Sequence, residues 1–212
     1  MSNKIQLRVA ELMCSRLCHD LISPISAINN GIELMNENDE GIIDSSIELL
    51  GTSAKQALDR LSFYRVAFGL AGGGAIISWN EIRNILEIFA AERKTTIVWT
   101  REPQPPDENI SHILAKLVVN IVYLAMECLP RGGVISVDNL EQKAPEPIVV
   151  RLEGPKCNLR DDVQSGLIPD LPIEQLSVRN IVAYLATSFA ICLGKSLKVR
   201  DENSNSIVIT IS

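Results

Sequence analysis

The first seventy residues carry apolar side chains at a helical period on both sides of one polar break. Apolar positions recur three or four residues apart through 5–35, and "NENDEG" at 36–41 then supplies turn and capping residues. A second helical run places apolar side chains at Ile43, Ile47, Leu50, Ala54, Leu58, Leu61 and Phe68. Two long helices with a short connection predict an antiparallel hairpin.

Such a hairpin has an apolar side that it cannot bury by itself. A second copy of the chain is the simplest cover, because two hairpins enclose the apolar side of each in a four-helix bundle. We therefore expect a homodimer.

The pattern changes after "AGGGA" at 71–75, which we interpret as a joint between residues 1–72 and 75–212. Ser78 and Glu81 form a capping box that opens a helix over 79–93. Two further helices are predicted over 107–129 and 178–193, and strands over 95–100, 134–137, 148–152, 197–199 and 207–211. This order predicts an α+β fold, in which the hairpin precedes an α/β sandwich with helices on one face of a mixed sheet.

The composition fits an ordered globular protein, with 46% hydrophobic and 22% charged residues. The net charge of −6 and the lack of a Lys/Arg run argue against a nucleic-acid partner. Residues 1–13 lack a continuous apolar stretch, and no segment reaches the roughly 18 uninterrupted apolar residues of a membrane span. We expect a cytoplasmic protein with no membrane partner.

The five cysteines are dispersed. Cys14 and Cys18 are one helical turn apart, but no second cysteine pair or nearby histidine completes a zinc site. We interpret the pair as small buried thiols and expect no bound metal.

The candidate chemistry lies in "LCHDLISPISAINNG" at 17–31, which contains His19. At about 100° per residue, the helix places His19 on a face of small, mostly polar side chains, opposite the aliphatic stripe. A histidine on such a face is either a solvated surface residue or an accessible nucleophile with room around it for a partner.

In the nucleophile interpretation, Asp20 accepts a hydrogen bond from Nδ1–H of His19, which fixes the tautomer and leaves Nε2 free to attack. Arg16, one turn earlier, could hold phosphoryl oxygens. Pro24 lacks the N–H that would bond the Asp20 carbonyl, so we expect a bend just after the site. The remaining candidates for phosphoryl or partner binding on this face are Ser23, Ser26 and Asn30.

The motif "HDLISP" at 19–24 resembles the H-box of the dimerisation and histidine-phosphotransfer domains of two-component sensor kinases. The longer stretch at 17–31, followed by a second helix and an α/β half, is similar to the ChpT family of alphaproteobacterial histidine phosphotransferases. The resemblance favours His19 as a nucleophile.

The second half resembles the ATPase domain of sensor kinases, but its nucleotide motifs are incomplete. "KLVVN" at 116–120 resembles the N-box, and "LPRGGVISV" at 129–137 resembles the turn and strand that follow it. Leu152 stands where the first glycine box has an acid that binds adenine, and "EQLSVRN" at 174–180 has no glycine where a phosphate-binding loop is expected. We therefore expect a degenerate ATPase-like domain that does not bind ATP.

The resemblance implies a histidine phosphotransferase of a phosphorelay. His19 would take a phosphoryl group from one receiver-domain aspartate and pass it to another, with receivers of a hybrid histidine kinase and of response regulators as partners. No cofactor is expected, since magnesium would come with the receiver. Two alternatives stay open, namely an ATP-dependent sensor-kinase core and a non-catalytic pseudo-kinase scaffold for response regulators.

Overall fold

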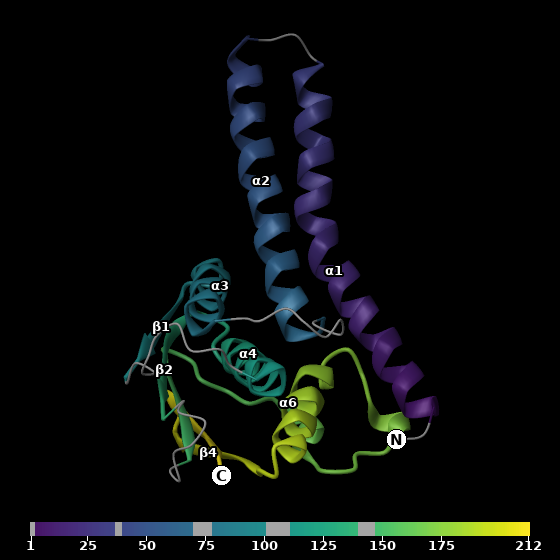
Figure 1. The fold of residues 1–212 in the computed structure, drawn as a ribbon. Helices are drawn as coiled ribbons and strands as arrows, with labels where there is room; N and C mark the ends of the chain where they lie inside the picture. The colour runs from purple at the N-terminus through teal and green to yellow at the C-terminus, as the bar shows by residue number, and fades with distance from the viewer. Residues whose placement is uncertain (1–2, 37–39, 70–77, 101–110, 140–146) are drawn as a thin grey trace.

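The structure is a computed structural model, and it describes residues 3–36, 40–69, 78–100, 111–139 and 147–212. Two long helices, α1 (Asn3–Met35) and α2 (Glu40–Ala67), lie side by side as an antiparallel hairpin (Figure 1). The lower part of α1 bends away from α2 and passes beside the second half of the chain. The predicted hairpin is therefore confirmed.

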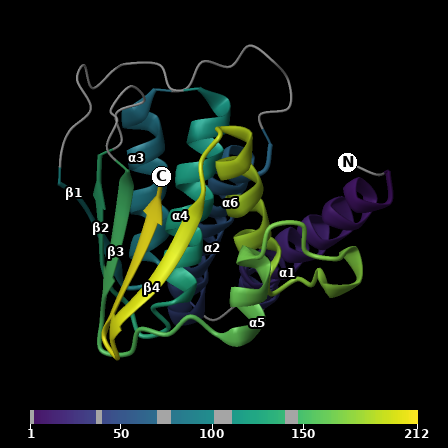
Figure 2. The same ribbon diagram turned by 90° about the horizontal axis from the view of Figure 1, so that it is seen from below.

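The second half is an α/β sandwich, as predicted. Its sheet contains β1 (Thr95–Trp99), β2 (Gly133–Asp138), β3 (Ile148–Glu153), β4 (Leu197–Asn203) and β5 (Ser206–Ile211) in the order β1-β2-β3-β5-β4. The β1–β2 pair is parallel and the other pairs are antiparallel. The helices α3 (Trp79–Ala91), α4 (His112–Glu127) and α6 (Ile181–Cys192) cover one face of this sheet (Figure 2). A short helix α5 (Asp161–Gln164) and single 3-10 turns at Ser165–Leu167 and Ile173–Gln175 connect β3 to α6.

Local capping sets where the helices begin. The predicted capping box of Ser78 and Glu81 opens α3. The helix predicted from 107 begins later, at His112, because Ser111 is extended and its hydroxyl accepts a hydrogen bond from the Leu114 N–H. Residues 107–110 lie outside the described residues, as does the predicted joint at 71–75, so the proposed domain division stays a prediction.

The lower end of α2 is packed into the core of the second half. Phe63, Tyr64, Val66 and Ala67 are buried there, and Phe63 stacks on Phe89 of α3 with ring centroids 3.6 Å apart. This aromatic contact and the buried face of α4 fix the base of the hairpin on the α/β domain.

The hairpin exposes several large apolar side chains to solvent. Those exposed on α1 and α2 include Ile22, Ile25, Ile32, Ile47, Leu58 and Leu61. The prediction that Cys14 and Cys18 are buried is wrong for the single chain, because both lie on hairpin surface that the α/β domain does not cover. Within the described part of the chain, every helix is too short or too polar to cross a bilayer.

Candidate functional site

His19 projects from the middle of α1, and its side chain is 84% exposed. Its Nδ1 lies 3.0 Å from Oδ1 of Asp20. Because an ionised carboxylate only accepts hydrogen bonds, this contact places the imidazole proton on Nδ1 and leaves the Nε2 lone pair free. Ser23, Ser26 and Asn30 are also exposed, further along α1 towards the tip of the hairpin. Their predicted roles stay predictions.

The carboxylate of Asp20 contacts His19 with one oxygen and is held by two tyrosines through the other oxygen. Its Oδ2 accepts hydrogen bonds from the hydroxyls of Tyr64 on α2 and Tyr123 on α4, the latter at 3.2 Å. Burial disfavours the charge of Asp20, but hydrogen bonds from His19 and Tyr64 and the nearby Arg16 guanidinium hold its pKa below the ordinary value. Burial raises the pKa of Tyr123 to about 12 and also raises that of Tyr64, so both hydroxyls stay protonated donors at neutral pH.

The backbone carbonyl of Asp20 also has an unusual partner. Pro24 lies inside α1 and has no N–H to bond this carbonyl, as the sequence predicted. The guanidinium of Arg60 on α2 donates to the carbonyl instead. The Nε of Arg60 also donates to Glu92 Oε2 at 3.1 Å, so a half-buried ion pair on the neighbouring elements braces α1 near Pro24.

Arg16 sits one turn before His19, but its side chain is only 15% exposed. Its Nε donates to the Tyr123 hydroxyl at 3.1 Å, one Nη donates to the Val178 carbonyl at 3.1 Å, and the other pairs with Glu127. These contacts tie α1 to the α/β domain. The predicted contact of Arg16 with phosphoryl oxygens stays a prediction, and the geometry favours a bracing role.

A hollow of about 350 Å³ opens beside His19. Its lining comes from α1, α4 and the segment before α6, and comprises Arg16, His19, Asp20, Glu127, Arg160, Val178 and Arg179. Arg160 and Arg179 both contact Asp162, yet their side chains are 55% and 72% exposed. The sequence reasoning missed both arginines, because neither lies in a recognisable motif and only the fold brings them to α1.

The residues that resemble nucleotide motifs have other partners. Asn120, in the N-box-like stretch, is completely buried, and its amide donates to the carbonyls of Ala67 at 3.0 Å and Lys116 at 2.8 Å. Leu152 is completely buried in β3. In 174–180, Asn180 closes the turn with its own side chain by accepting from the Ser177 N–H at 2.8 Å.

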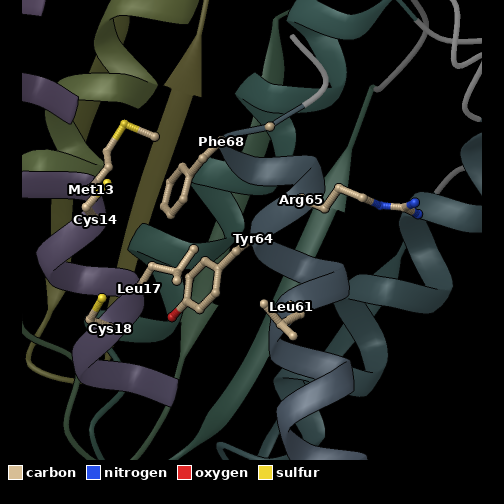
Figure 3. A pocket seen from close by; sticks show the side chains of 9 residues that line it. Met13, Cys14, Leu17, Cys18, Leu61, Tyr64, Arg65 and Phe68 are labelled. Carbon is tan, nitrogen blue, oxygen red and sulfur yellow. The ribbon is translucent and has the colours of Figure 1, made fainter. Parts of the chain in front are cut away.

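A second, apolar hollow of about 430 Å³ lies at the lower end of the hairpin (Figure 3). Leu17, Tyr64 and Phe68 project into the space between α1 and α2 and line this hollow, and Cys14 and Cys18 line it from α1. The described side chains include no group of three or more His, Cys, Asp or Glu residues that could hold a metal ion.

Known proteins are similar to this chain in sequence and in fold. A family model described as the histidine phosphotransferase C-terminal domain matches residues 79–205. The protein phosphotransferase ChpT of Brucella abortus (strain 2308) is 33% identical over 180 residues, which cover 82% of each chain. A solved structure of a bacterial phosphotransferase matches with a TM-score of 0.78 and 26% identity, covering 100% of this chain and 98% of that chain. A histidine kinase domain from Erythrobacter litoralis EL346 also matches, with a TM-score of 0.44 and 13% identity over 98% of this chain and 91% of that chain.

The family model, the Brucella relative and the solved phosphotransferase structure define a histidine phosphotransferase of a phosphorelay, built as a helical hairpin joined to an α/β sandwich. Within that class, the chain belongs to the ChpT family.

Proposed function

We propose that His19 carries the phosphoryl group, and that the chain moves phosphate between receiver-domain aspartates without using ATP. The observation that carries the proposal is the exposed imidazole of His19, whose Nδ1 is held by Asp20 so that Nε2 faces outward. The chain's other histidine, His112, is half-buried at the first residue of α4.

The transfer needs one nucleophile and good positioning. The Nε2 lone pair attacks the phosphorus of an aspartyl phosphate, an N–P bond forms, and the acyl O–P bond breaks to release the receiver's carboxylate. The imidazole keeps its proton on Nδ1 throughout this step. Attack by a second receiver's aspartate on the phosphohistidine reverses the process, and magnesium bound to the receiver would neutralise the phosphoryl oxygens.

Three features of the α/β domain support independence from ATP. Asn120 is completely buried and both of its amide hydrogens are donated to backbone carbonyls, so its side chain is held inside the domain, although its Oδ1 accepts no hydrogen bond from the described residues. Leu152 offers adenine no carboxylate. The turn at 174–180 lacks the glycines that let backbone N–H groups approach phosphates.

The hollow beside His19 suits the phosphorylated end of a receiver domain. Arg160 and Arg179 present partly exposed guanidinium groups at its rim, where they would attract a carboxylate-rich and phosphorylated surface. The receivers would then touch both α1 and the α/β domain during transfer.

The exposed apolar side chains of the hairpin support a homodimer. Ile25 and Ile32 on α1, together with Ile47, Leu58 and Leu61 on α2, would be covered in a four-helix bundle. Their exposure in a single chain is otherwise unfavourable.

The test is phosphate loading from a receiver domain phosphorylated in advance. The wild-type protein should acquire an acid-labile, base-stable phosphate, His19→Ala should acquire none, and His112→Ala should load like wild type. Equal loading of His19→Ala would overturn the proposal. Labelling by ATP alone would indicate a sensor kinase, whereas receiver binding without loading would indicate a non-catalytic scaffold.

A further inference from the structure

We propose that Tyr64 and Tyr123 are positioning residues for His19, because they anchor the Asp20 carboxylate that orients the imidazole. Tyr123 comes from α4, so the α/β domain would take part directly in preparing the histidine. The inference rests on the proposed phosphotransfer function and adds the residues that set the tautomer of His19.

The two oxygens of Asp20 have separate partners. Oδ1 faces Nδ1 of His19 at 3.0 Å, while Oδ2 accepts from both tyrosine hydroxyls. Arg16 adds a positive charge with its Nε 3.9 Å from Oδ2. A carboxylate fixed through one oxygen presents the other in a constant direction, and that direction selects the Nδ1–H tautomer.

The tyrosines can act as a rigid anchor because they are locked by packing. Tyr64 is 2% exposed and Tyr123 is completely buried. Their hydroxyl oxygens are 3.2 Å apart, and both rings pack edge-to-face against Phe63. Neither hydroxyl can reach a docked receiver, so each serves the interior of the protein.

The anchor also depends on the interface between the hairpin and the α/β domain. Arg16 donates to the Tyr123 hydroxyl oxygen and pairs with Glu127 one turn further along α4. The Tyr123 hydroxyl oxygen accepts from Arg16 with a lone pair and keeps its single hydrogen for donation to Asp20. The α/β domain thus supplies a contact to Asp20, the residue beside His19.

Without the anchor, Asp20 would rotate more freely and the exposed imidazole would populate both neutral tautomers. Only the Nδ1–H form offers a free Nε2, so the fraction of protein ready to accept phosphate would fall. Loss of one such hydrogen bond should slow loading by about fivefold.

The test is nitrogen NMR of imidazole-labelled full-length protein, comparing wild type with Tyr123→Phe and Tyr64→Phe. We expect the Nδ1–H tautomer to dominate in wild type and a mixture of tautomers in both variants. Tyr184→Phe is the matched control, because it removes the hydroxyl of another buried tyrosine, on α6, and should leave the tautomer unchanged. Unchanged tautomer populations in Tyr123→Phe and Tyr64→Phe would overturn the inference.

Folding and function are measured separately from the tautomer. Circular dichroism and thermal unfolding show whether each variant is folded, and if Tyr123→Phe does not fold, Tyr64→Phe alone decides the question. Loading from a phosphorylated receiver then tests the proposed function. Absence of loading in wild type would refute the phosphotransfer role of His19. In that case, a mixture of His19 tautomers in the two tyrosine variants would still establish that the tyrosines anchor Asp20.

Discussion

Arg16 of α1 and Glu127 of α4 form an ion pair that joins the helix carrying His19 to the α/β domain. Both side chains are largely buried, at 15% and 19% exposed, and Oε2 of Glu127 has no hydrogen-bond partner among the residues that the structure describes. The pair sits in the wall of the hollow beside His19. The pair therefore links the helix that carries His19 to the helix that forms the opposite wall of the hollow.

Removing one member of this pair should be costly. We expect Arg16→Met to lower the free energy of unfolding by about 3 kcal/mol, because it leaves a buried carboxylate without its cation. Arg16→Met combined with Glu127→Leu should recover most of that loss, since no uncompensated charge remains. Urea denaturation of the single and double variants measures both effects.

The control for this comparison is Lys55→Met. Lys55 pairs with Asp59 on α2, but its side chain is 68% exposed, so its loss should change stability by less than about 0.5 kcal/mol. If Arg16→Met costs no more than Lys55→Met, the pair does not brace the two halves.

The low pKa of Asp20 predicts a loss of stability in acid. A carboxyl whose folded pKa lies below its unfolded value of about 3.9 stabilises the fold fully above that value, and this contribution disappears as the pH falls through the folded pKa. Asp20→Asn should therefore be less stable than wild type at pH 7, and the difference should shrink below about pH 4. Urea midpoints measured from pH 3 to pH 7 provide the comparison, and a difference that does not change with pH would contradict the assignment.

Asn120 should behave as a structural residue. Asn120→Ala leaves the buried Ala67 carbonyl without its side-chain donor, so we expect a loss of about 2 kcal/mol in the free energy of unfolding. Addition of ATP and magnesium should leave the melting temperature of wild type and variant unchanged. A ligand-induced rise in wild type that disappears in Asn120→Ala would instead make Asn120 a nucleotide or metal ligand.

Sequence patterns predicted what depends on near neighbours in the chain. The helical periods, the capping box at Ser78 and the missing hydrogen bond at Pro24 all follow from residues within a few positions of one another. The partners of Asp20 could not be predicted in this way, because Tyr64 and Tyr123 are 44 and 103 positions away in the sequence. Each of these tyrosines would also be expected in an ordinary apolar core. The same holds for Arg16. Its helical phase placed it on the face of His19, but its ion pair with Glu127 joins residues far apart in the sequence and could not be predicted.

The apolar face of the hairpin leads to a prediction about assembly. Leu58→Glu and Ile47→Glu should convert a dimer to a monomer, because each places a charge inside the expected four-helix bundle. Ile191→Glu is the control, since Ile191 is 54% exposed on α6, as Ile47 is on α2. Sedimentation equilibrium measures the mass of each variant, and a monomeric wild type at micromolar concentration would refute the dimer.

The arginines at the rim of the hollow should guide receiver docking. Arg179→Glu should lower the rate of phosphate loading about tenfold at low salt, because a repulsive charge now faces the acidic site of the receiver. The effect should weaken as salt screens the charges. Arg200→Glu makes the same charge change at a side chain on β4 that is 77% exposed, and it should load like wild type. Stopped-flow or quench kinetics at two salt concentrations would measure the rates, and equal slowing by both substitutions would show that net charge, not the hollow, controls the encounter.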